Sequence, residues 1–193
     1  MPRKRTIELT DPRALRALAH PVRLTLVGLL RREGPLTATQ AGERIGESAT
    51  TCSFHLRQLA RYGLVEEAGG GKGRERPWQA TAWFTSWPGA TRDPQYAAAA
   101  VLLEAVVAER YFEQLLAWLA RRSEDDPAWQ EAAHFGDTTL FVTAEELAEL
   151  RRRLDELLEP YSERARNPEL RPPDTRRVAF LRLAHPTEAA SER

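Results

Sequence analysis

The feature that most constrains the fold is a connection of only two residues, Gly46-Glu47, between two segments with helical periodicity. These segments cover about residues 38–45 and 49–62, and Thr37 and Ser48 precede them as candidate N-caps. The positions expected to face inward are Ala38, Ala41 and Ile45 in the first segment, and Ala49, Cys52, Leu56 and Leu59 in the second. Because so short a connection leaves the two helices tightly crossed, the sequence predicts a helix-turn-helix arrangement.

A basic hairpin is expected directly behind this helix pair. Gly63 ends the second helix, and a short strand follows at Leu64–Ala68. A glycine-rich turn over Gly69–Glu75 then leads to a returning strand at Arg76–Thr81. Two more helices are expected upstream, over residues 11–33, with a break at Pro21. This order of elements predicts a winged helix-turn-helix domain.

Charge is divided unevenly along the 193 residues, although the net charge is zero. Residues 1–80 hold 14 Lys/Arg and 8 Asp/Glu, a net +6, whereas residues 81–193 hold 14 and 20, a net −6. A basic front half favours an anionic partner for that half alone. The single cysteine, Cys52, excludes an internal disulfide or a multi-thiolate zinc site and is compatible with a reducing cytoplasm. No apolar run approaches the length of a transmembrane helix, so we expect a cytoplasmic protein without a membrane partner.

In the second half of the chain, the sequence predicts a helix, a strand, a second helix and a second strand, in that order. A long helix is expected over residues 96–122, and its wide apolar face predicts a dimer interface. The interface residues would be Leu102, Leu103, Val106, Val107, Leu115 and Leu119. Short strands are expected at Thr138–Val142 and Arg177–Ala184, on either side of a helix over about 144–164 that Thr143 and Glu146 would cap.

The fold class expected from the sequence is therefore mainly α with a little β (α+β). A flexible basic arm at residues 1–10 precedes a winged helix-turn-helix domain at 11–82. A linker at 83–95 then leads to a dimerisation and possible effector domain at 96–193 that contains the two short strands.

Double-stranded DNA is the anionic partner that the pattern favours. A recognition helix presents hydrogen-bonding side chains to base edges, while arginines bind phosphates. The outward positions of the second helix and the basic residues of the hairpin are Thr50, Thr51, Ser53, Phe54, His55, Arg57, Gln58, Arg61, Lys72, Arg74 and Arg76.

Two stretches of the sequence resemble the arsenic-repressor-like (ArsR-like) winged helix-turn-helix regulators. They are Leu18-Ala19-His20-Pro21-Val22-Arg23-Leu24 and Cys52-Ser53-Phe54-His55-Leu56-Arg57-Gln58-Leu59, the latter continuing through Gly63-Leu64-Val65. The resemblance covers about residues 10–82 and implies a dimeric repressor or activator with its recognition helix in the major groove and the hairpin as wing. By position it implies DNA contacts from Thr50, Thr51, Ser53, His55 and Arg57. The metal-sensing members carry a cysteine pair on the preceding helix, whereas residues 38–44 contain no Cys or His, so we expect no metal and no cofactor.

Other functions remain open at this point. Residues 96–193 could form a small-molecule-binding or enzymatic domain with the winged helix as an accessory, or the winged helix could be a protein-interaction module. No nucleophile elbow, phosphate loop or dinucleotide fingerprint occurs, so we expect no catalytic residues and no enzymatic activity. The interpretation that we favour is a homodimeric regulator on a palindromic operator, with an unknown small-molecule effector possible and a redox role for Cys52 undecided.

Overall fold

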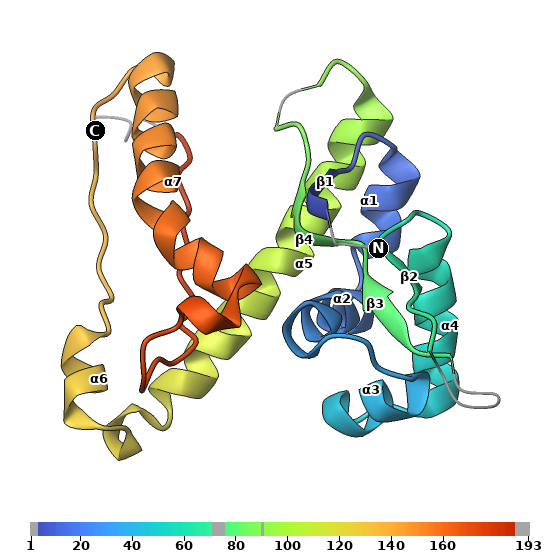
Figure 1. The fold of residues 1–193 in the computed structure, drawn as a ribbon. Coiled ribbons are helices and arrows are strands. Elements are labelled where there is room, and N and C mark those ends of the chain that lie inside the picture. Colours follow the sequence, from blue (N-terminus) through green and yellow to red (C-terminus); the bar gives the residue numbers. More distant parts are fainter. Residues whose placement is uncertain (1–3, 71–75, 90, 188–193) are drawn as a thin grey trace. The chain divides into compact units, whose positions relative to one another are not determined.

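The computed structural model describes residues 4–70, 76–89 and 91–187. The chain forms two compact units, Met1–Gly136 and Asp137–Arg193. Figure 1 shows a mainly helical chain with a few short strands, which confirms the α+β class.

The first unit opens with a strand that the sequence did not predict, followed by the four helices and the two hairpin strands that it did predict. In chain order these are β1 (Lys4–Glu8), α1 (Pro12–Leu18), α2 (Pro21–Glu33), α3 (Ala38–Ile45), α4 (Ala49–Ala60), β2 (Val65–Glu67) and β3 (Trp78–Ala80). The unit continues with β4 (Ala82–Ser86), α5 (Pro94–Leu119), the 3-10 turn η1 (Arg122–Glu124) and α6 (Pro127–Ala132).

The helices begin where the sequence places their N-caps. The Asp11 carboxylate accepts from the Arg13 backbone N–H at 2.8 Å, and the Ser48 hydroxyl accepts from the Thr51 N–H at 3.0 Å. Thr37 forms a full capping box with Gln40 at the start of α3. Each cap satisfies a backbone donor that the helix leaves unpaired, so local residue choice fixes these boundaries.

Leucines from α1, α2 and α4 form the core of this unit. Among the largest side chains less than 2% exposed are Leu15, Leu26, Leu30, Leu56, Leu59 and Leu64. The predicted inward positions Ala41, Cys52, Leu56 and Leu59 are buried, and Ala38 and Ile45 pack on the core while half-buried. Ala49 is exposed, contrary to prediction, because it is the first residue of α4 and lies at the helix end.

The expected flexible arm is wrong for Lys4–Glu8, which forms β1. This strand pairs in parallel with β4, in a register that places Thr6 beside Phe84 and Glu8 beside Ser86. Leu9 follows β1 and is buried in the core at 3% exposure, which anchors the segment. The expected linker over 83–95 is shortened for the same reason, since β4 occupies its first residues.

Tyr96 joins this strand pair to α5, and its hydroxyl donates to the Leu9 carbonyl at 2.7 Å in a buried site. We expect Tyr96→Phe to lower the free energy of unfolding by about 1–2 kcal/mol, because the buried carbonyl loses its donor. Urea unfolding measures the change, and Tyr161→Phe, which alters an exposed tyrosine, serves as the matched control. Equal stability of the two variants would contradict the role given to this bond.

The second unit contains α7 (Ala144–Arg166) and the 3-10 turn η2 (Pro168–Leu170). The predicted capping box of Thr143 and Glu146 is present at the start of α7. The two predicted strands, Thr138–Val142 and Arg177–Ala184, are wrong, since no strand forms within residues 137–187. Their apolar, β-branched residues suit a strand, but a strand also needs a neighbour for its backbone hydrogen bonds, and these segments have none in the described part of the unit.

Candidate nucleic-acid interface

The turn between α3 and α4 sets the direction of α4. Gly46 adopts a left-handed conformation with φ of 74°, which a glycine reaches without strain. The Glu47 N–H then donates to the Gly42 carbonyl at 3.0 Å, and Ser48 caps the next helix. These contacts close the turn tightly and fix the angle at which α4 leaves it.

One stripe of α4 faces solvent and is named here the α4 stripe: Thr50, Phe54, Arg57 and Arg61. The half-buried residues Thr51, Ser53 and Gln58 border it. Phe54 is 53% exposed, although α4 also supplies side chains to the core. Seven of the eight predicted outward residues on this helix therefore reach the surface at least in part.

His55 is the exception, and its predicted outward direction is wrong. Its side chain is only 8% exposed, because position 55 lies beside Leu56 on the arc that packs on the core. Its ring lies against that of His20 with the centroids 4.6 Å apart. His20 is itself the N-cap of α2, where its Nδ1 accepts from the Val22 N–H at 3.2 Å.

The histidine pair is electrostatically unfavourable in its charged form. Burial is the main cause that lowers the pKa of both His20 and His55, and the nearby Arg23 adds to it. Glu47 acts in the opposite direction on both. Sequence reasoning missed this pair, although the spacing of Cys52, His55, Leu56 and Leu59 is that of a complete buried helix face.

The charged side chains of the α4 stripe itself are both arginines. No Asp or Glu occurs between Ser48 and Val65, whereas Arg57 and Arg61 both lie on the stripe. The Arg57 guanidinium bonds back to Ser53, through the carbonyl and the hydroxyl, both at 3.1 Å. Both bonds are at the surface, so the side chain can exchange them for a phosphate at little cost.

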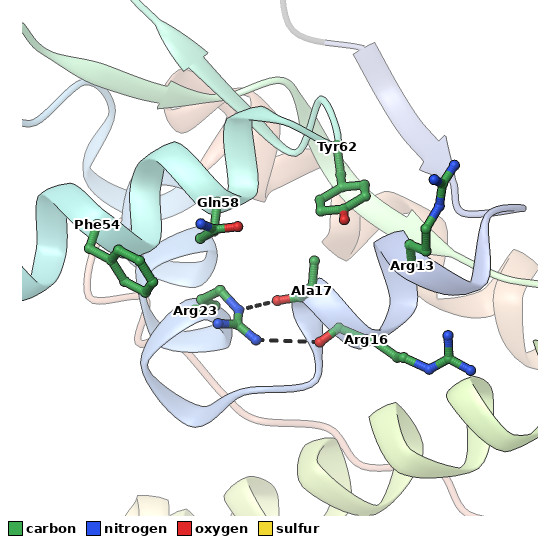
Figure 2. A pocket seen from close by; sticks show the side chains of 7 residues that line it. All are labelled: Arg13, Arg16, Ala17, Arg23, Phe54, Gln58 and Tyr62. Carbon is green, nitrogen blue, oxygen red and sulfur yellow. Dashed lines mark hydrogen bonds between the residues drawn. The ribbon is translucent and has the colours of Figure 1, made fainter.

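A hollow borders the stripe on each side. The first, of about 440 Å³, lies between α4 and the α1–α2 corner, and Figure 2 shows its lining. Arg23 lies in the middle of this view, with its guanidinium bonded to the Arg16 and Ala17 carbonyls. The second, of about 690 Å³, lies between α4, the start of α3 and the β2–β3 pair, and includes Thr39, Gln40, Ser53, Arg57 and Arg76 in its lining.

The hairpin is antiparallel, with Val65 opposite Ala80 and Glu67 opposite Trp78. The backbone of Leu36 bonds to Trp78 on the other side, which ties the hairpin to the start of α3. Arg76 is exposed and forms an ion pair with Glu67 at 3.1 Å. The predicted contacts Lys72 and Arg74 lie outside the described residues.

Residues 18–68 match a protein family described as a helix-turn-helix domain. The chain contains a helix-turn-helix domain. The match includes α2, α3 and α4 whole and ends one residue after β2, so the complete α4 stripe lies inside it. A domain of this kind supports DNA-binding regulation. A comparison with curated proteins gives no match.

Outside the helix-turn-helix domain, α5 exposes a row of large apolar side chains, named here the α5 apolar face. Its exposed members are Val101, Leu102, Tyr111, Phe112, Leu116 and Leu119. Two of the six predicted interface residues, Leu102 and Leu119, belong to it, and Val106, Val107 and Leu115 are half-buried. The prediction is wrong for Leu103, which is fully buried in the core beneath the helix-turn-helix domain and cannot touch a partner.

Three further features of the described residues concern metal binding, the Cys52 thiol and membrane-spanning helices. Among the residues that the structure describes, no three His, Cys, Asp or Glu side chains gather as a metal site would require. Cys52 is buried, and burial raises the pKa of its thiol, as expected of a neutral core residue. No helix within residues 4–70, 76–89 and 91–187 is both long and apolar enough to cross a bilayer.

Proposed function

We propose that this protein is a sequence-specific, double-stranded-DNA-binding transcriptional regulator of the ArsR-like winged type, acting as a homodimer on a palindromic operator. In this proposal α4 enters the major groove, and the β2–β3 hairpin is a wing that reaches the minor groove and its phosphates.

The observation that carries the proposal is the α4 stripe within the matched domain. It combines an exposed hydroxyl near the helix start with two arginines, in a stretch from Ser48 to Val65 whose sequence contains no Asp or Glu. Thr50 would meet base edges, and the half-buried Gln58 could read an adenine. Arg57 and Arg61 would bind phosphates, which supply affinity without sequence information.

The α5 apolar face supports the dimer. Single exposed apolar residues are ordinary on a protein surface, whereas a row along one long helix is typical of an interface. A second copy of the same face would cover it in a two-fold arrangement. Two recognition helices would then lie about one DNA turn apart, which is why the operator should be an inverted repeat.

Selection of bound sequences from a random DNA pool by the purified full chain tests the function. We expect an inverted repeat to be enriched, with an affinity that falls steeply as salt rises. Thr50→Ala should weaken binding to the selected duplex by about 1 kcal/mol more than binding to random duplex, because only base readout is lost. Thr138→Ala, at an exposed threonine of the second unit, is the control.

The outcomes separate the alternatives. Absence of any duplex affinity would leave a protein-interaction module or a ligand-binding protein and would refute the proposal. Equal losses on both duplexes would remove Thr50 from base readout.

A further inference from the structure

We infer that the hollow between α4 and the α1–α2 corner, named here the α1–α4 hollow, binds a phosphate of the DNA strand that runs on the side of α4 opposite the wing. The inference rests on the proposed function and extends it to α1, which lies mostly outside the matched family segment.

The side chains that line the α1–α4 hollow are suited to bind an anion. Its residues are Arg13, Arg16, Ala17, Arg23, Phe54, Gln58 and Tyr62. No carboxylate is among them, and five of the seven side chains carry hydrogen-bond donors. A ligand with only acceptor oxygens could therefore be bonded from several directions, and the Asp11 carboxylate beside the hollow is already bonded to Arg13.

The three arginines differ in their availability. Arg23 is half-buried and committed to the carbonyls at the end of α1. Arg13 is held by the Asp11 carboxylate, through bonds of 3.0–3.2 Å from Nε and Nη2. Arg16 is exposed and makes one long bond, 3.3 Å, to the Gln95 carbonyl. Figure 2 shows the Arg13 and Arg16 guanidinium groups extending from α1 away from Gln58, so Arg16 would swing from the Gln95 carbonyl to reach a phosphate in the hollow. Arg16 is thus the arginine whose charge a phosphate captures at the lowest cost.

The position of the hollow fits the geometry of a duplex. A major groove is about 12 Å wide, and a helix that enters it has one phosphate backbone on either side. The wing and the start of α3 line the hollow on one side of the α4 stripe, and the α1–α4 hollow lies on the other. Each hollow therefore faces one of the two strands. Phe54 also lines the α1–α4 hollow, with about half of its side chain exposed.

The test compares Arg16→Gln and Tyr62→Phe with Arg151→Gln, which removes the same charge from an exposed position on α7. Duplex affinity is measured with the full chain at several salt concentrations, and thermal unfolding checks that each variant is folded. We expect Arg16→Gln to weaken binding to selected and random duplexes alike, by about tenfold, and to reduce the salt slope by about one. Tyr62→Phe should weaken both by about threefold with an unchanged salt slope, since it removes one neutral donor.

Whether the unaltered protein binds duplex DNA distinguishes a failure of the proposed function from a failure of this inference alone. If it binds no duplex, the proposed function fails and this inference with it. If it binds duplex and Arg16→Gln matches Arg151→Gln in affinity and slope, this inference alone is overturned. It is also overturned if inorganic phosphate raises the melting temperature through Arg16 and Tyr62 while duplex binding is unaffected, because the hollow is then a site for a free anion.

Discussion

Replacement of Gly42 by alanine is expected to destabilise the helix-turn-helix domain by about 3 kcal/mol. A Cβ at this position of α3 would lie 2.5 Å from the Glu47 carbonyl oxygen, well inside van der Waals contact. The clashing atom belongs to the backbone of the α3–α4 turn, so no side chain can move to relieve it. Either α3 shifts or the turn opens, and both displace α4.

Gly28→Ala is the matched control, because it introduces the same methyl group on α2. There the nearest atoms are the ends of two arginine side chains, the closer being Arg32 Nη1 at 3.0 Å, which can rotate away. Alanine is also the better helix former, so this variant should be neutral or more stable by up to about 1 kcal/mol. Urea unfolding followed by circular dichroism measures both. Loss of less than about 0.5 kcal/mol in Gly42→Ala would contradict the close approach of the α3–α4 turn to Gly42.

The parts of the fold that follow from sequence are those fixed by local chemistry. The caps at Asp11, Thr37 and Ser48 and the break at Pro21 each act within a few residues, and the helix positions follow from them. The pairing of β1 with β4 joins segments more than seventy residues apart. Neither segment has a sequence feature that identifies the other as its partner. The parallel pairing is settled by burial of Leu9 and by the Tyr96 bond, which are properties of the assembled core.

The candidate site shows the same division. The α4 stripe follows from helical periodicity once the phase of the helix is known. The polarity of His55 predicts an outward side chain, whereas its spacing from Cys52 and Leu59 places it on the buried face of α4. An imidazole can be buried when it is neutral, so polarity alone does not decide its side of the helix. The phase of α5 was likewise uncertain from sequence, since apolar residues surround much of that helix and only packing distinguishes Leu102 from Leu103.

Acidification from pH 7.5 to 5.5 is expected to destabilise the helix-turn-helix domain through the His20–His55 pair. The Nδ1 of His20 can cap α2 only while it is unprotonated, since it accepts the Val22 N–H. His55 is 8% exposed, and its Nδ1 has no hydrogen-bond partner within the described residues. A proton on either ring therefore places charge in a confined site beside Arg23, while Glu47 acts in the opposite direction on both rings.

The sign follows from the direction of the two pKa shifts. Burial lowers the pKa of both histidines in the folded protein, whereas the unfolded chain titrates near the ordinary value of about 6.5. Below that pH the unfolded state binds more protons than the folded state. Stability is therefore greatest above about pH 6.5 and falls as the pH drops through the folded values, by at most about 2.7 kcal/mol per pH unit when both histidines contribute.

Urea unfolding at half-unit pH steps measures this slope, and three variants assign it. His20→Asn retains an N-cap oxygen but does not titrate, and His55→Leu fills the buried position with an apolar side chain. Each should remove part of the pH dependence, and the double variant should remove the contribution of the pair. His185→Gln, at an exposed position of the second unit, is the matched control. A double variant that loses stability with acid as steeply as the unaltered protein would show that carboxylates elsewhere, and not the buried imidazoles, set the acid limit of this domain.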